Sequence, residues 1–385
     1  MTTDLNLAFR PSEPVLRIES TSRRVQQPQS TADLVSLAMG EPNFDTPAPI
    51  REAAERAMAE GRTHYSPLVG EPALREALAE KLSAQAGEEL LAADVLVTQG
   101  GTAGLAAVIL AVVNPGDRVI IPDPTYSLYS DLISMAGGEC VPVPLREDLH
   151  WDLATLEEAL TGAKLFVFCN PSNPTGIVHT RAELEALGEM LAGTDTLVLS
   201  DEAYSDLVYT PEPFTSALSV PTLRGRTVYC QTFSKSYAMT GWRVGYVWGP
   251  HDVVAAATRL HATFNGSVSG VNQYAALAAL KEGDAEVRRM LEAYRRRRAL
   301  MREGLASIRG LTASSPDGAF YLFPRYDFDI EAVELVGRLR EGGVAVRPGS
   351  EFGAHGEHHL RLSYAASEQE IAEGIKRLAA GLAHL

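Results

Sequence analysis

The chain has 385 residues, of which 45% are hydrophobic and 22% are charged, as is ordinary for a globular protein. This length exceeds the size at which a single hydrophobic core stops growing, so we expect two domains. The net charge of −15 argues against a nucleic-acid partner, because contacts with a phosphate backbone require a basic surface. No uncharged apolar run reaches the ~18 residues of a membrane span, and no signal-peptide pattern opens the sequence. We therefore expect a soluble, cytoplasmic protein without a membrane partner.

The first 45 residues are polar, contain prolines and show weak periodicity, which predicts an arm rather than a domain. This arm ends in the turn-rich segment Gly40-Glu41-Pro42-Asn43. The alanine-rich segment Pro47–Glu60 predicts a helix that stops at Gly61. A second helix is predicted to begin at Pro72, where the sequence PALREALAEKL has a regular amphipathic period.

From residue 95 onward, short apolar segments alternate with helical ones. Strands separated by helices in this way are typical of a largely parallel sheet that is covered by helices on both faces. We therefore predict a large α/β domain. Its predicted strands are 95–98, 118–121, 140–143, 165–169, 196–200, 227–231 and 244–248, and its predicted helices include 105–113, 126–136, 153–160 and 181–191.

Beyond residue 250 the pattern changes to long helices and shorter strands, which predicts a smaller α+β domain. The predicted helices are 253–263, 273–281 and 285–307, and the predicted strands are 319–323, 344–346 and 360–363. We divide the chain into an arm that forms part of the small domain (1–45), a large domain (46–285) and a small C-terminal domain (286–385).

Two compositional features have simple interpretations. The run Arg295 to Arg298 lies in a segment of helical apolar period, so we interpret it as a solvent-exposed helix face. The cysteines, Cys140, Cys169 and Cys230, lie far apart in apolar segments. Their placement favours reduced core residues over a disulfide framework or a metal site, and we expect no metal ion.

Polar motifs follow several of the predicted strands. In an open α/β sheet, ligands bind outside the carboxyl ends of the strands. Gly100-Gly101-Thr102 opens a helix, where free backbone N–H groups favour an anion, although such turns also serve tight packing alone. The loop NPSNPTG carries Asn173, and Tyr126 follows another strand as either a core residue or a stacking surface. The motif Asp201-Glu202-Ala203-Tyr204 places an acid and a phenol together, although Asp201 alone could be a helix N-cap.

The segment from Gln231 to Trp248 contains the most specific combination of residues. Two apolar strands flank small hydroxyl residues, one lysine and one arginine. Lys235 is a candidate nucleophilic amine, and Thr232, Ser234 and Arg243 could bind a phosphate by charge-assisted hydrogen bonds. A lysine considered alone is usually a solvated surface residue, so this interpretation depends on the flanking strands and on the other motifs.

Together these motifs resemble the class I/II branch of the pyridoxal-phosphate aminotransferases of fold type I. The resemblance extends from about Gly40 to Tyr364. The motifs NPSNPTG, DEAY, SKSYAMTGWRVGY and RLSYA stand in the expected order, and this combination is highly specific. The resemblance implies pyridoxal 5′-phosphate as cofactor. It also implies transfer of the amino group of an L-amino acid to a 2-oxo acid by a ping-pong mechanism.

The resemblance also implies a role for each matching residue that contacts the cofactor. Lys235 would form the Schiff base and act as the proton shuttle, Asp201 would pair with the pyridine nitrogen, and Tyr126 would stack on the ring. Asn173 and Tyr204 would donate to the phenolic oxygen of the ring. The phosphate would be bound by Gly101, Thr102, Thr232, Ser234 and Arg243.

The remaining implied roles concern the substrate and a second subunit. Arg361 would bind the substrate α-carboxylate, with Gly40 and Asn173 beside the substrate. Tyr65 would reach the phosphate of the neighbouring subunit, which implies a homodimer with shared sites.

Two other functions and the choice of substrate stay open at this stage. A β-lyase that cleaves a carbon–sulfur bond would use the same lysine, aspartate and arginine. A ligand-sensing module of a transcription regulator would need a basic helix-turn-helix segment, and residues 1–45 are too short and too polar for one. The donor could be acidic, aromatic or small and apolar. Relatives that prefer dicarboxylates use a further cation, for which the unplaced candidates are Arg23, Arg24, Arg62 and Arg347.

Overall fold

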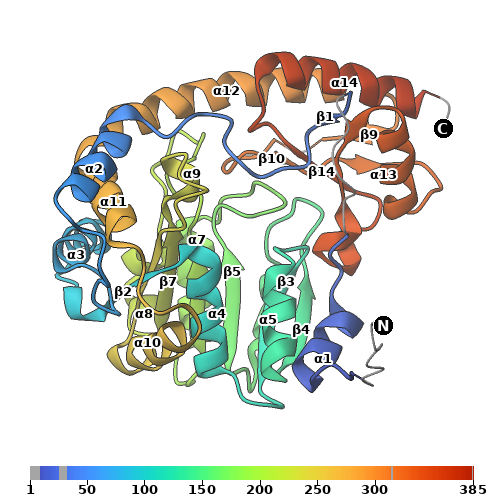
Figure 1. Ribbon diagram of the computed structural model, residues 1–385. Helices are drawn as coiled ribbons and strands as arrows, with labels where there is room; N and C mark the ends of the chain where they lie inside the picture. Colours follow the sequence, from blue (N-terminus) through green and yellow to red (C-terminus); the bar gives the residue numbers. More distant parts are fainter. Residues whose placement is uncertain (1–8, 26–32, 314, 384) are drawn as a thin grey trace, which may run out of the picture.

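The computed structural model describes residues 9–25, 33–313, 315–383 and 385, and its largest element is a seven-stranded sheet (Figure 1). The strand order is β2-β8-β7-β6-β5-β3-β4. Strand β8 runs antiparallel to both of its neighbours, and the other strands are parallel to one another. The strands are β2 (Val95–Thr98), β3 (Arg118–Asp123), β4 (Glu139–Pro144), β5 (Leu165–Cys169), β6 (Leu197–Asp201), β7 (Thr227–Thr232) and β8 (Gly245–Trp248).

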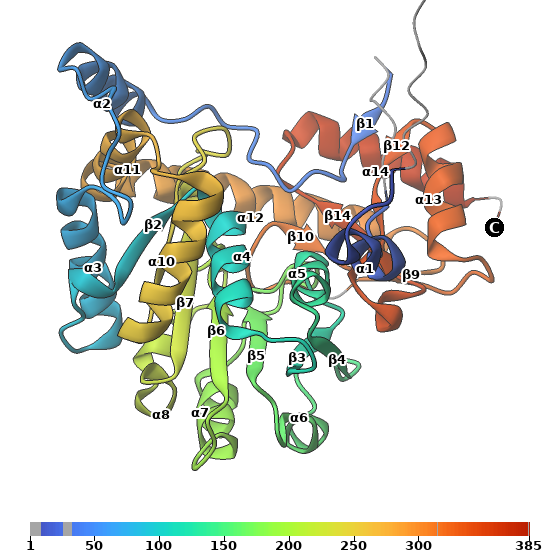
Figure 2. The ribbon, with the colours of Figure 1, turned by 60° about the horizontal axis from the view of Figure 1, so that its bottom comes forward.

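Helices cover both faces of this sheet because its central strands are apolar on both sides (Figure 2). In β5, Leu165 and Val167 enter one core cluster, and Phe166 and Phe168 enter another on the opposite face. The first cluster includes α4 (Gly100–Val112), α5 (Leu128–Ala136) and α10 (His251–Asn265). The second includes α6 (Leu153–Leu160), α7 (Arg181–Met190) and α8 (Pro221–Arg224).

A third core cluster lies where β2 and β8 meet a group of helices from both halves of the chain. It includes α2 (Ala48–Ala59), α3 (Pro72–Ala86) and α11 (Gly270–Glu282). The 23-residue helix α12 (Asp284–Ala306) then runs from this region to the C-terminal part (Figure 1). No helix in the described ranges combines the length and the apolarity that crossing a membrane requires.

The C-terminal part contains small sheets packed with two helices. Strand β14 (Leu360–Ser363) lies between β10 (Tyr321–Leu322) and β13 (Arg347–Pro348), while β9 (Leu311–Thr312) pairs with β11 (Arg325–Tyr326). The helices are α13 (Ala332–Glu341) and α14 (Glu368–Leu382).

The N-terminal arm is associated with this C-terminal part. Strand β1 (Val35–Ser36) pairs in parallel with β12 (Val344–Ala345), and the Ser363 N–H donates to the carbonyl of Leu37. These contacts support the division into an arm, a large domain (46–285) and a small domain (286–385), which we propose as the domain organisation.

The predicted fold class is confirmed, and the predicted strands and helices are found with their ends shifted by a few residues. The arm also contains a helix that was not predicted, α1 (Glu13–Thr21), whose Arg17 Nε donates to the carbonyl of Ser134 at 2.8 Å. In the arginine run, Arg295 and Arg296 are exposed as expected, but for Arg297 the expectation was wrong. Arg297 is buried and donates to Asn43 Oδ1 at 2.8 Å and to the carbonyl of Ala365. The three cysteines are unpaired, as predicted.

Candidate active site

A cavity of about 650 Å³ lies between the carboxyl edge of the large sheet and the C-terminal part. Every site residue predicted from the sequence lines it, except Asn173 and Tyr65. The predicted residues that line it are Gly40, Gly101, Thr102, Tyr126, Asp201, Tyr204, Thr232, Ser234, Lys235, Arg243 and Arg361.

The sheet brings these residues together because its parallel strands end at the same level. Asp201, the last residue of β6, is the register partner of Cys169 on β5 and of Cys230 on β7. The chain then leaves β7 through the short helix α9 (Phe233–Ser236), which carries Lys235. The acid and the amine therefore project from neighbouring strand ends into one cavity.

Lys235 is half-buried, and its Nζ donates to the carbonyl of Gly40 at 2.7 Å. Burial, together with the nearby charges of Arg361 and Arg243, lowers the pKa of the Lys235 amine to about 8, although Glu41 and Asp201 oppose the shift. A useful fraction of this amine is therefore unprotonated near neutral pH, as a nucleophile or a general base requires.

Asp201 is buried and accepts two hydrogen bonds. The Tyr129 hydroxyl donates to Oδ2 at 2.7 Å, and the Ala203 N–H donates to Oδ1 at 3.2 Å. Burial raises the pKa of Asp201, and these hydrogen bonds and the charge of Lys235 oppose that rise. A positively charged ligand group beside Asp201 would therefore be stabilised strongly, since the charges interact in a poorly solvated site.

Tyr204 and Tyr321 form a pair of phenols at the cavity wall. Their hydroxyl oxygens lie 2.9 Å apart, and burial raises the pKa of both phenols, so both stay protonated donors. Tyr321 also explains why residue 40 is glycine. A Cβ at Gly40 would lie 2.0 Å from the Tyr321 hydroxyl oxygen.

Arg361 lies on β14, where side chains alternate between two faces. Leu360 and Leu362 enter the core, and Arg361 faces the cavity. Its Nη1 donates to Asn173 Oδ1 at 3.0 Å, and its Nη2 donates to the carbonyl of Ala38 at 2.7 Å. Its Nε is buried and has no hydrogen-bond partner among the described residues. The guanidinium therefore keeps donor capacity for an anionic ligand.

A second group of donors surrounds the N-terminus of α4. Gly100, its first residue, has a φ of +75°, and a Cβ there would lie 2.7 Å from Arg243 Nη2. Only glycine tolerates both conditions, so the guanidinium can lie directly against the helix terminus. The Thr232 hydroxyl donates to the Ser234 hydroxyl at 2.9 Å. Arg243 donates to the carbonyl of Thr240 and forms no ion pair with a carboxylate in the described ranges.

These features fit the pyridoxal phosphate that the resemblance implies. The cavity wall holds more cationic than anionic side chains, as a phosphorylated cofactor and a carboxylate substrate require. The cations are Arg24, Lys235, Arg243, Arg347 and Arg361, and the acids are Asp201 and Glu351. The unpaired Arg243 lies at a helix N-terminus, which is a favourable phosphate site. Asp201 is placed to hold the proton of a ring nitrogen.

Tyr65 does not reach this cavity. It is 99% exposed and lines a separate surface cavity with Arg62 and Phe264. Its predicted contact with a neighbouring subunit therefore stays a prediction that a single chain does not test.

Several residues of the site were not identified from the sequence. Tyr129 does not line the cavity but donates to Asp201. It follows Tyr126 by three positions, a spacing that places both on one side of a helix start, and this signal could have identified it. Tyr321 lies in the apolar run AFYLF, where a tyrosine is not distinguishable from a core residue. Arg24 and Arg347, which were unplaced, both line the cavity.

Arg347 and Arg361 are register partners on the antiparallel strands β13 and β14. Like charges directly opposite each other destabilise a sheet unless an anion lies beside them. Glu351 supplies part of the compensating negative charge, because its Oε2 lies 3.3 Å from Arg347 Nη1. Arg347 also donates to the carbonyl of Val25, and Arg24 forms an ion pair with Asp131 at 2.9 Å.

Comparison with known proteins gives results that agree with the cavity and with the sequence motifs. The family profile described as "Aminotransferase class I and II" matches residues 32–378. The aspartate/prephenate aminotransferase of Thermus thermophilus is 38% identical, over 95% of this chain and 96% of that protein.

Solved structures also match over nearly the whole chain. The aspartate aminotransferase from Thermus thermophilus with maleate has a TM-score of 0.85 and 37% identity, and the match covers 97% of this chain and 98% of that one. The aromatic aminotransferase from Pyrococcus horikoshii has a TM-score of 0.89 and 34% identity, with coverage of 96% and 99%.

Proposed function

This chain belongs to the class I and II aminotransferases and is a pyridoxal-phosphate-dependent enzyme of amino-group transfer; from this premise we propose that its substrates are dicarboxylic amino acids and 2-oxo acids. The observation that carries the proposal is the pairing of Arg347 with Arg361 on adjacent strands of one cavity wall. We also propose the following roles for the residues of this site.

The cofactor, when bound, supplies an electron-accepting ring and an aldehyde that carries the amino group. Asp201 holds a proton on the ring nitrogen, because its buried carboxylate stabilises a positive charge there. Tyr204 and Asn173 donate to the ring oxygen. Asn173 is suited to this role because its Oδ1 already accepts from Arg361, which leaves its NH₂ group as the donor.

Arg361 and Lys235 act on the substrate itself. The planar guanidinium of Arg361 binds the α-carboxylate, and Asn173 and the carbonyl of Ala38 fix its orientation. Lys235 Nζ would remove the proton from the substrate Cα and deliver it to the carbon on the other side of the substrate nitrogen, which the cofactor would supply. Its lowered pKa of about 8 suits both transfers. At the opposite end of the cavity, Arg243, Thr232, Ser234, Gly101 and Thr102 bind the phosphate, and Tyr126 stacks on the ring.

The proposed substrate class depends on Arg347 and Arg24, which line the cavity together with Arg361. A dicarboxylate placed with its α-carboxylate on Arg361 has its second carboxylate a few atoms away, on the side of Arg347. That carboxylate would supply the negative charge that two facing guanidinium groups need, and Arg24 would add to the field. Glu351 opposes this attraction only in part, because its single carboxylate faces the three cations Arg24, Arg347 and Arg361 in the cavity wall. Aspartate and prephenate, after which the Thermus thermophilus relative is named, and the maleate of one solved structure are all dicarboxylates.

Replacing Arg347 with methionine tests this assignment. Methionine keeps the unbranched side chain and removes the charge. We expect the KM for aspartate and glutamate to rise about ten- to hundredfold, the effect of losing a charged hydrogen bond of about 1.5–3 kcal/mol. The kcat/KM for phenylalanine should change by less than about threefold. Steady-state kinetics with each donor measure both values.

The matched control is Arg325→Met, because Arg325 is exposed and pairs with Asp327 away from the cavity. It should leave all donors unaffected. An equal loss for aspartate and phenylalanine in Arg347→Met would mean that Arg347 only supports the local structure, and the substrate proposal would be withdrawn.

Amino-group transfer itself can be separated from the β-lyase alternative, which the comparisons do not favour. The holoenzyme is mixed with single L-amino acids without any oxo acid. In a transferase, the donor converts the visible absorbance of the bound cofactor once per site, and a matching 2-oxo acid restores it. A lyase would instead release ammonia continuously while the visible band persists.

We further propose that the protein works in the cytoplasm as a homodimer with shared sites. The unpaired cysteines support a reducing compartment. The exposed Tyr65 and its exposed neighbours Phe264 and Leu68 support an interface, because large apolar side chains rarely stay uncovered together. Light scattering of the holoenzyme should give twice the mass of one chain, and Tyr65→Phe should weaken retention of the cofactor during dialysis. A monomer at working concentration would contradict the shared site.

A further inference from the structure

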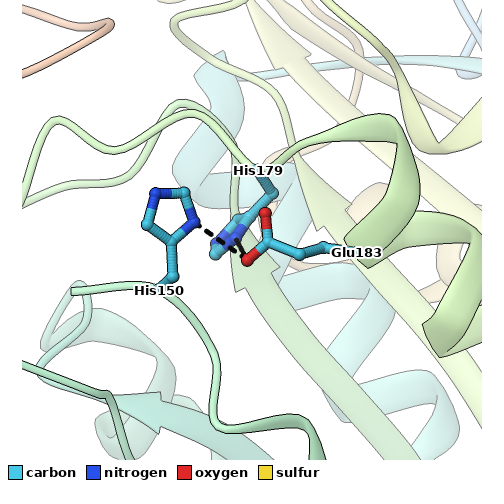
Figure 3. Close-up of side chains that lie close together, drawn as sticks. All are labelled: His150, His179 and Glu183. Carbon is cyan, nitrogen blue, oxygen red and sulfur yellow. Dashed lines mark hydrogen bonds and ion pairs between the residues drawn. The ribbon is translucent and has the colours of Figure 1, made fainter. Parts of the chain in front are cut away.

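Three side chains outside the active-site cavity bring two imidazole nitrogens and a carboxylate oxygen to one point (Figure 3). Glu183 Oε1 lies 2.9 Å from His150 Nδ1 and 3.5 Å from His179 Nδ1. All three ligand atoms lie within 4.8 Å of one another. His150 comes from the segment between β4 and α6, whereas His179 precedes α7 and Glu183 lies in its first turn.

The helix terminus fixes the orientation of Glu183. Thr180 is the N-cap of α7, and its backbone N–H and hydroxyl donate to Glu183 Oε2 at 2.8 and 2.9 Å. This reciprocal capping box uses one carboxylate oxygen. The other oxygen, Oε1, is thereby turned toward the two histidines, as Figure 3 shows.

Aromatic packing fixes the orientation of His179. Its ring stacks on Trp151 at a centroid distance of 3.8 Å and meets the edge of Phe168 at 6.0 Å. Its backbone N–H donates to Asn170 Oδ1. The ring is 4% exposed, so its Nδ1 is held in place before any ligand arrives.

His150 provides access from solvent. Its side chain is 22% exposed, more than those of Glu183 and His179, which are 13% and 4% exposed. Because it is the least constrained of the three, it can turn by the small amount that coordination requires.

We propose that His150, His179 and Glu183 form a binding site for one divalent transition-metal ion of the zinc class, with water in the fourth position. Two imidazoles and one carboxylate are the ligand set of zinc, cobalt and nickel, whereas magnesium and calcium prefer oxygen ligands. Metal–ligand bonds of about 2.0–2.1 Å in a tetrahedron separate the ligand atoms by about 3.3 Å. The observed separations from Oε1, 2.9 and 3.5 Å, lie on either side of that value.

The ion takes the place of the protons that now lie between the imidazoles and Oε1, so binding releases them to solvent.

The proposed ion has a structural function. It joins two segments: the one between β4 and α6 that carries His150, and the one that runs from Asn170 into the first turn of α7 and carries Asn173 to the active site. None of its three ligands lines the catalytic cavity. We therefore expect the ion to raise the thermal stability of the protein without entering the reaction.

Cobalt(II) is the probe for the test, because its visible spectrum distinguishes tetrahedral from octahedral coordination. Holoenzyme treated with a chelator and then freed of it is titrated with cobalt chloride. We expect tetrahedral bands that saturate at one ion per chain, and a higher melting temperature. His150→Gln and Glu183→Gln should each weaken binding at least about tenfold. Glu183→Gln keeps the capping box, since glutamine also serves at that position, so the helix should stay intact.

The matched control is His251→Gln, because His251 forms a similar exposed pair with Asp94 but belongs to no metal-ligand cluster within the described ranges. This variant should bind cobalt as the wild type does. Cobalt bands of equal strength in wild type and in His150→Gln would place the metal elsewhere, for example at the cofactor, and would overturn the proposal. The absence of any saturable tetrahedral signal in the wild type would overturn it as well.

Discussion

Replacing Lys235 with alanine is expected to abolish amino-group transfer, with a loss in kcat of at least about 10⁴-fold. In the proposed mechanism Lys235 provides both the amine that binds the cofactor and the base at the substrate Cα. A positioned base alone raises the rate about 10²- to 10⁴-fold. No second lysine lines the cavity in the described part of the chain, so no neighbouring amine can substitute.

Turnover and the visible absorbance of the bound cofactor measure the effect. Lys235→Arg keeps the charge but not the reactive amine, and it should be as inactive as the alanine variant. Lys376→Ala is the control, because Lys376 is 80% exposed and pairs only with its helix neighbour Glu373 among the described residues. Wild-type turnover in Lys235→Ala would show that another group performs the chemistry.

The environment of Lys235 also predicts how cofactor binding depends on pH. A lysine in water has a pKa of about 10.4, and burial beside Arg361 and Arg243 lowers the pKa here to about 8. The unprotonated amine therefore accumulates as the pH rises through about 8. Recombination of the apoenzyme with pyridoxal phosphate should accelerate over the same range and then level off. A rate that keeps rising toward pH 10 would contradict the lowered pKa.

Replacing Asp201 with asparagine is expected to lower kcat by about 10²- to 10³-fold, the usual cost of removing one preorganised charge at a reacting centre. Asparagine has the same shape and can still accept the hydrogen bond from Tyr129. It cannot hold a proton on the ring nitrogen, so removal of the Cα proton should become slower. Retention of the cofactor should weaken in parallel.

Single-turnover kinetics with α-deuterated aspartate separate this effect from product release. The matched control is Glu202→Gln, since Glu202 is the adjacent buried acid but bonds to Ser200, Ser216 and the backbone of Ala217 instead of lining the cavity. That variant should keep a normal isotope effect. An unchanged single-turnover rate in Asp201→Asn with cofactor present would refute the assigned role.

The large sheet was predictable because each of its strands carries a strong local signal. Segments such as Leu165–Cys169 are apolar on both faces, and this pattern allows little except a central strand between two helix layers. Helix α1 was missed because Glu13–Thr21 has no buried residue of its own. It is held in place by contacts such as the hydrogen bond from Arg17 to Ser134. A local sequence pattern cannot indicate a partner that lies more than one hundred positions away.

The candidate site was predictable where it consists of motifs at strand ends, as for Asp201 and Lys235. On the C-terminal strands only Arg361 was identified, through the motif RLSYA, and its partner Arg347 was not. Arg347 faces Arg361 only through the register of β13 and β14, and short strands leave their register unspecified in the sequence. The cluster of His150, His179 and Glu183 was not identified because His150 reaches the pair His179 and Glu183, which are four residues apart, only through the fold.

The attachment of the N-terminal arm has a consequence for the order in which a nascent chain can become active. The carbonyl of Ala38 meets Arg361, 323 positions later, while the carbonyl of Gly40 meets Lys235. On the ribosome the arm emerges first, and the strands of the large sheet can pair before β12 and β14 exist. The segment from Val35 to Gly40 must therefore wait for these strands through most of synthesis, and such distant contacts form slowly. Leu37, which is fully buried in the folded protein, stays uncovered until then.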